Sequence, residues 1–124
     1  MTKPLGMIFY ERLMPGSQLV NRLQDMGYRV STVTDLAALS PAVEKEMPMV
    51  LIMDLTSKNG DVATVIKDLR SNAKTQHIPV IGFTNKENKK AQDSATEAGA
   101  KLVAIDEAIL PQLPHLLEQA LEVD

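Results

Sequence analysis

The sequence predicts an α/β protein in which a doubly wound, five-stranded parallel sheet carries helices on both faces. Two observations support this fold class: short apolar runs recur along the 124 residues, and segments with apolar side chains at helical spacing separate them. Such alternation is typical of βαβ units, which build parallel sheets. Right-handed crossovers between the strands then place helices on both faces of the sheet.

The strands are expected at the apolar runs and the helices between them. The expected strands cover residues 5–10, 28–33, 49–54, 78–83 and 102–105. The expected helices cover residues 15–26, 36–46, a third segment after Asp61, residues 86–98 and a last segment at 113–121. The natural strand order for this pattern is the flavodoxin-like order 2-1-3-4-5.

Glycine and proline mark several of the helix boundaries. Gly27 and Gly99 follow the first and fourth helices, where a glycine is favoured as the C-cap. Pro41 falls inside the second helical pattern, which predicts a late start or a kink near Ser40.

The later boundaries follow from capping and from the missing amide of proline. Asp61 comes after an Asn-Gly turn signal and is expected to cap the third helix. Pro79 lies near the start of the fourth strand, where a donor can be spared. Pro111 and Pro114 are expected in the first turn of the last helix.

Composition limits the class of protein. The chain is short enough for a single domain over residues 1–124. It has no cysteine, which removes disulfides and thiolate chemistry. Its net charge of −3 argues against a nucleic-acid binder. Its apolar runs are too short to cross a membrane, and the N-terminus lacks a signal-peptide pattern, so we expect a soluble, cytoplasmic protein.

The chemistry-bearing residues follow the strands. Asp54 ends the third apolar run and Thr84 follows the fourth. Open α/β sheets bind ligands at the carboxyl ends of their strands, so this acid and this hydroxyl are expected to lie close together. Tyr10, Glu11 and Asp106 should lie along the same edge. An acid and a hydroxyl at such an edge suggest a phosphoryl site.

The chain resembles a response-regulator receiver domain of two-component signalling, similar to chemotaxis regulators, over essentially its full length. Residues 76–81 resemble the family's entry into strand four, and residues 97–100 its entry into strand five. Asp54 matches the phospho-acceptor, and Thr84, 30 residues later, matches the switch hydroxyl. The resemblance implies a Mg²⁺ site formed by Glu11, Asp54 and the backbone carbonyl of Thr56.

The site also departs from the family. Asp106 stands where the family has a lysine, and an anion there would repel a phosphoryl group. Lys58 and Val62 replace the usual proline and glycine after the acceptor. Asp106 is expected either to cap the last helix or to join Glu11 and Asp54 in binding Mg²⁺ or Ca²⁺. Outside this site, His77, His115 and the lysine cluster at residues 86–90 are expected to be solvated surface groups.

Three functions remain open. The first is a pseudo-receiver, not an enzyme, that acts through protein contacts with a histidine kinase, a phosphotransfer protein or an output domain. In the family, the face formed by helix four, strand five and helix five is the output and homodimer surface. Here its residues would be Lys89, Lys90, Asp93, Leu102 and Leu110. The second is a receiver phosphorylated on Asp54 with Mg²⁺ and switched by Thr84. The third is a small-molecule binder on the same fold.

Overall fold

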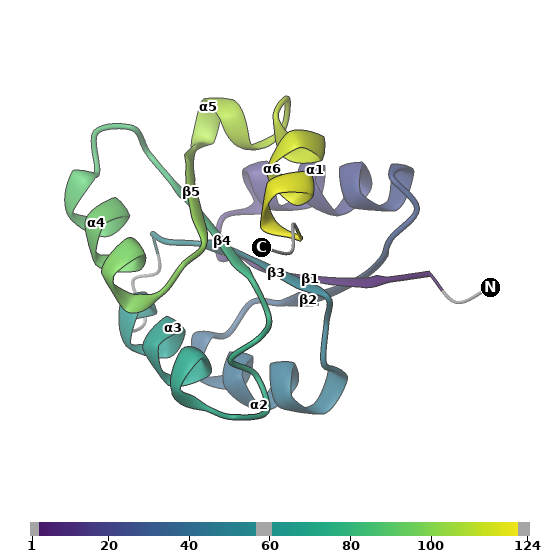
Figure 1. Ribbon diagram of the computed structural model, residues 1–124. Coiled ribbons are helices and arrows are strands. Elements are labelled where there is room, and N and C mark those ends of the chain that lie inside the picture. Colours follow the sequence, from purple (N-terminus) through teal and green to yellow (C-terminus); the bar gives the residue numbers. More distant parts are fainter. Residues whose placement is uncertain (1–2, 57–60, 122–124) are drawn as a thin grey trace.

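The computed structural model describes residues 3–56 and 61–121, and for residues 13–15 only the backbone. Within these residues, five strands form one sheet: β1 Leu5–Phe9, β2 Arg29–Val33, β3 Val50–Asp54, β4 Val80–Thr84 and β5 Leu102–Ile105. All paired strands are parallel and their order is β2-β1-β3-β4-β5, as the sequence predicts (Figure 1).

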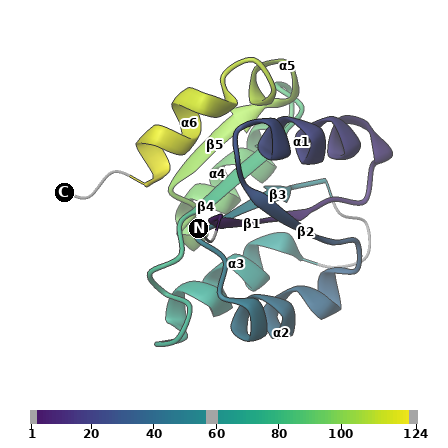
Figure 2. The same ribbon diagram turned by 90° about the vertical axis from the view of Figure 1, so that its right-hand side faces the viewer.

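In the described part of the chain, six helices cover the sheet. Their bounds are α1 Leu13–Asp25, α2 Leu36–Glu46, α3 Val62–Ser71, α4 Lys89–Ala98, α5 Asp106–Ile109 and α6 Leu113–Ala120. Helices α1, α5 and α6 lie on one face of the sheet, and α2, α3 and α4 on the other (Figures 1 and 2). No helix in the described ranges is long and apolar enough to cross a membrane.

The two faces of the sheet form two separate cores, because successive residues of a strand point to opposite faces. Met7, Leu51 and Met53 pack with the layer of α2, α3 and α4. Ile52 and Phe83 pack with the layer of α1 and α6. Every residue of β3 and of β4 is buried, which explains why both read as continuous apolar runs.

The strand boundaries differ from the prediction at a few residues. Tyr10, Tyr28 and Met49 lie just outside the strands, and Met49 is 50% exposed. β4 begins at Val80 rather than at Ile78, after Pro79, which has no amide to donate to the ladder. At its other end β4 extends to Thr84, whose Cα pairs with Ile105 of β5.

The first two helices also differ from the prediction. α1 begins at Leu13, two residues early. Pro41 causes no late start: α2 begins at Leu36, where the Asp35 side chain accepts from the Ala37 amide. A proline in the sixth position removes only one backbone bond, and the buried side chains of α2 hold the helix against the sheet.

The fourth helix begins later than predicted, at Lys89. Before it, the Asn85 side chain accepts from the Glu87 amide and forms a separate turn. The last helix is two helices, because Pro111 lies between α5 and α6 rather than in a first turn. Pro114 does lie in the first turn of α6, and Asp61 caps α3 as predicted.

Candidate functional site

The site lies where the carboxyl ends of β1, β3, β4 and β5 meet. Asp54 is the last residue of β3, Thr84 is the last of β4, and Asp106 follows β5 directly. Arg12 comes three residues after β1 and immediately precedes α1. The parallel register places Asp54 beside Phe83 and Thr84 beside Ile105, so these side chains come from neighbouring strands.

Asp54 is a fully buried acid whose oxygens are nearly saturated with hydrogen bonds. Only 1% of its surface is exposed. Its Oδ1 accepts from Arg12 Nη2 at 3.1 Å, from the Thr56 amide at 3.0 Å and from Thr56 Oγ1 at 2.6 Å. Its Oδ2 accepts from Arg12 Nε at 2.8 Å. An ionised carboxylate offers about four acceptor positions, so four donors leave little capacity for another group.

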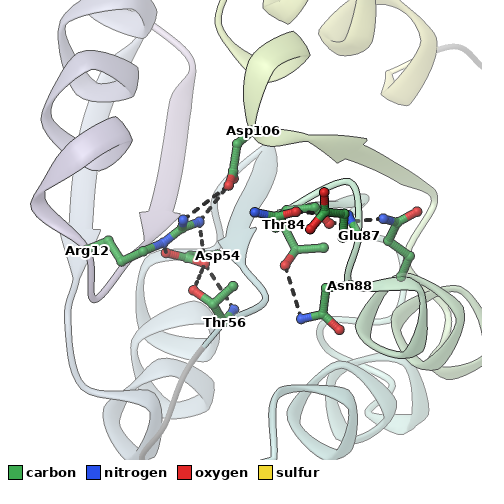
Figure 3. Close-up of polar contacts among 9 residues, drawn as sticks. Arg12, Asp54, Thr56, Thr84, Glu87, Asn88 and Asp106 are labelled. Atoms are coloured by element: carbon green, nitrogen blue, oxygen red, sulfur yellow. Dashed lines mark hydrogen bonds and ion pairs between the residues drawn. The ribbon is translucent and has the colours of Figure 1, made fainter.

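Arg12 joins Asp54 to Asp106 (Figure 3). Its Nη1 donates to Asp106 Oδ2 at 3.1 Å and its Nη2 to Asp106 Oδ1 at 3.0 Å. The guanidinium is therefore bidentate to both carboxylates, a geometry that a planar cation with five donors suits and an ammonium does not. Hydrogen bonds to Asp106 and Asp54 raise the pKa of Arg12 above its ordinary value, which keeps it charged.

The surroundings hold the guanidinium in place. Its carbon lies 5.9 Å from the centroid of the Phe83 ring, within the range of a cation–π contact. The side chain of Arg12 is 37% exposed and that of Asp106 21% exposed. The cluster thus has a buried side at Asp54 and an open side toward solvent, and its two acids and one base sum to a negative charge.

Thr84 is not part of the Arg12 cluster and instead contacts Asn88. It is fully buried, and its Oγ1 accepts from Asn88 Nδ2 at 3.5 Å, a long hydrogen bond. Asn88 in turn caps α4, because its Oδ1 accepts from the Ala91 amide. Among the hydrogen bonds of the described residues, Thr84 is thus connected to the start of α4 and not to Asp54 (Figure 3).

The three-acid metal site expected at Glu11, Asp54 and Asp106 does not form. No three Asp, Glu or His residues in the described ranges are grouped so that they could hold a metal ion. The structure brings Asp54 and Asp106 together, but around a guanidinium. A divalent cation does not fit this donor set, since both carboxylates already bind Arg12 and its positive charge would repel the metal.

The alternative expectation for Asp106, that it caps the last helix, is also wrong. Asp106 is the first residue of the short helix α5 rather than its N-cap, and its carboxylate binds Arg12.

The other residues singled out in the sequence lie as follows. Thr56 donates hydrogen bonds from its amide and its hydroxyl to Asp54, and Val62 is buried at the start of α3. Lys58 lies outside the described residues. His77, His115 and the lysine cluster are exposed, as predicted.

Arg12 is the residue that sequence reasoning missed. It follows Glu11 in a loop, and no spacing pattern links it to Asp54 or Asp106, which are 42 and 94 residues away. The available signal was indirect: two acids expected at one buried edge of a sheet require a cation, because unpaired buried carboxylates are costly. Such a cation is expected in one of the loops that follow the strands at that edge, and Arg12 lies in the loop after β1.

Comparisons with known proteins identify the fold. No protein-family model matches the sequence, and a search of curated proteins finds no match. Among solved structures, the chain is similar to a chain assigned as a response regulator from Chloroflexus aurantiacus, with a TM-score of 0.89 and 21% identity. That match covers 97% of this chain and 98% of the other.

Two further similar structures are receiver domains. One belongs to the sensor histidine kinase PA1611 of Pseudomonas aeruginosa and holds a magnesium ion in its active-site cleft (TM-score 0.87, 16% identity, covering 97% and 98% of the two chains). The other belongs to NtrX of Brucella abortus (0.84, 17%, covering 96% and 99%). Receiver domains of this kind are signalling domains and not enzymes. This chain therefore has the fold of response-regulator receiver domains.

Proposed function

We propose that this chain is a receiver-type signalling domain that acts through protein–protein contacts, with Asp54 held by Arg12 instead of being phosphorylated. The observation that carries the proposal is the bidentate contact of one guanidinium with both Asp54 and Asp106. Domains with this fold need no catalytic activity of their own to transmit a signal.

The state of Asp54 supports this proposal. A carboxylate attacks phosphorus only with an oxygen that can approach the phosphoryl group, and the charge on the transferring oxygens must be neutralised. Asp54 is buried and meets four donors, two of them from Arg12. Phosphoryl transfer would therefore have to displace the guanidinium first.

The charges around Asp54 also support the proposal that Asp54 is not phosphorylated. In the family that the sequence resembles, a lysine at the position of Asp106 and a bound metal neutralise the phosphoryl oxygens. Here the position carries an acid, and the one cation of the cluster is shared between two carboxylates. Arg12 therefore compensates the resident acids and leaves no positive charge for an incoming phosphoryl group.

The proposed partners are a histidine kinase, a phosphotransfer protein or an output domain. The expected contact face is formed by α4, β5 and the last helix, α6. Lys89, Lys90 and Asp93 are exposed there, and Leu102 and Leu110, which lies between α5 and α6, are partly exposed. A face that combines exposed charged side chains with partly exposed leucines suits a reversible protein contact, including one with a second copy.

A phosphate mimic tests the proposal. Beryllofluoride with Mg²⁺ is added while the amide NMR signals of Thr56 and Thr84 are recorded. In the wild-type protein these amide signals should not shift. Asp106→Lys should not respond either, since Arg12 still holds Asp54, whereas the double variant Arg12→Ala with Asp106→Lys should bind the mimic because a free cation then faces an accessible carboxylate.

The control is Asp54→Asn in the double variant, which should abolish the response. A response of the wild-type protein would overturn the proposal and favour phosphorylation of Asp54. That second function has two observations in its favour: Thr84 lies at the end of the strand beside β3, and the similar PA1611 domain holds magnesium in its cleft. It requires Arg12 to leave Asp54 when Mg²⁺ binds.

A further inference from the structure

A groove crosses the edge of the sheet opposite the Arg12 site, along the amino ends of four strands. It has a volume of about 660 Å³. Its lining comes from the start of β1, the start of β2, the segment between α2 and β3, and the segment before β4. The lining residues include Lys3, Arg29, Met47, Met49 and His77. Nothing in the candidate site described above uses this surface.

The floor of the groove is fixed by backbone hydrogen bonds. The Arg29 amide donates to the Pro4 carbonyl at 2.8 Å, and the Met49 amide donates to the Leu5 carbonyl at 2.8 Å. Arg29 Nε also donates to the Lys3 carbonyl at 3.2 Å. The three segments are therefore held together before any ligand arrives, which lowers the entropic cost of binding there.

Two methionines expose apolar surface in this groove. Met47 is 43% exposed and Met49 50% exposed, and both are large hydrophobic residues. Met47 also has a φ of 48°, a left-handed backbone conformation that glycine or asparagine adopts at lower cost after a helix. Neither solvation nor backbone preference favours methionine here. Methionine is, however, well suited to adaptable binding surfaces.

The charge around the methionines is positive, in contrast to the net charge of the whole chain. Among the described residues, the cations Lys3 and Arg29 and the imidazole of His77 line the groove with a single acid, Glu46, which accepts from Ser31 Oγ at 3.2 Å. His77 also lines an adjoining cavity of about 490 Å³, and the described lining of that cavity includes the cations Arg70 and Lys101. Basic side chains thus border the exposed apolar patch on the sides formed by β1, β2 and β4.

We propose that this groove is a docking surface for an acidic segment of a partner protein, with an apolar side chain between the acids. The apolar residue contacts Met47 and Met49, and the carboxylates lie against Lys3, Arg29 and His77. The choice of an acidic partner rests on charge complementarity, which governs both orientation and the rate of association. Binding at this groove does not depend on the state of Asp54, which is not part of its lining.

Methionine methyl NMR tests this directly on the full chain. A synthetic peptide of alternating glutamate and leucine is titrated in parallel with a peptide in which lysine replaces each glutamate. The acidic peptide should shift the methyl signals of Met47 and Met49 in a saturable way and leave the buried Met7 and Met53 unchanged. The basic peptide should leave all four signals unchanged.

Variants separate the groove from general charge effects. Arg29→Glu should weaken acidic-peptide binding by about tenfold, because it reverses a charge at the groove. Lys86→Glu, which changes an exposed lysine near the other end of the sheet, should not change the affinity. Met47→Asn should also weaken binding while keeping the fold, since asparagine tolerates the left-handed conformation.

Several results would overturn the proposal. These are no shift of Met47 and Met49 with the acidic peptide, an equal response to the basic peptide, or equal losses from Arg29→Glu and Lys86→Glu. A further one is a shift of the same methyl signals on raising the protein concentration without peptide, since that would identify a second copy of the chain as the occupant.

Discussion

Arg12 determines the electrostatics of the candidate site. It compensates two acids that come from different strand ends, and one of them, Asp54, is buried. Its pKa is raised, and a cation whose folded pKa exceeds its unfolded value stabilises the fold at every pH below the unfolded value. This contribution is therefore constant through the physiological range and should not make stability pH-dependent.

Removing the guanidinium should destabilise the fold. Arg12→Ala leaves the buried Asp54 without its charge partner, and we expect a loss of about 1–3 kcal/mol in the free energy of unfolding. Asp54→Asn in the same background should cost less than in wild type, because a neutral side chain needs no cation. Urea unfolding of the two single variants and the double variant measures this coupling.

Arg22→Ala is the matched control. It also removes an arginine side chain, but one that is exposed in the last turn of α1. It should change stability by less than about 0.5 kcal/mol. Additive effects of Arg12→Ala and Asp54→Asn would show that the ion pair is energetically unimportant.

At the scale of elements, caps and turns decided where the helices begin. Asp61 caps α3 through the Ala63 amide at 3.1 Å, as the sequence predicts. α4 begins late because Asn85 and Asn88 each use their side chains on nearby amides. The two asparagines compete locally with helix formation, and hydrophobic spacing alone does not detect that competition.

The N-cap residue Asp61 should make the stability of the fold depend on pH. The hydrogen bond from the Thr64 hydroxyl lowers the pKa of Asp61 below its ordinary value. A group with a lowered folded pKa stabilises the fold above its unfolded pKa and loses that stabilisation as the pH falls through the folded value. Asp61→Asn should therefore lower the Tm at neutral pH, and the difference from wild type should shrink in acid.

Thermal denaturation at neutral pH and below pH 3.8, the ordinary carboxyl value, makes the comparison. Asp61→Ala is the matched control: it also removes the acceptor for the Ala63 amide, so its deficit should persist in acid. A deficit of Asp61→Asn that is equal at both pH values would refute the assignment.

On the scale of the whole molecule, the sheet order places β3 and β4 between other strands and between both helical layers. All ten of their residues are buried, whereas β2 at the edge has exposed positions at Arg29 and Thr32. Local opening requires the loss of buried contacts, so the central strands should open least often.

Hydrogen exchange should therefore be slowest for the amides of β3 and β4 and faster for those of β2. Amide exchange followed by NMR at neutral pH resolves the strands individually. Protection of β2 equal to that of β3 would contradict this order and indicate that the sheet opens only as one unit.

The sequence alone determined the parallel sheet, its strand order and the places of Asp54 and Thr84 at the ends of two strands, because these depend on short-range patterns of apolar residues and on the topology they imply. Only the tertiary structure decided the site's charge. Asp106 takes neither predicted role, and Arg12, in a loop that carries no pattern, binds two acids that are distant in the sequence. The physical reason is that an ion pair forms only between side chains that the fold brings close together, and the sequence does not show which loops meet at the strand ends.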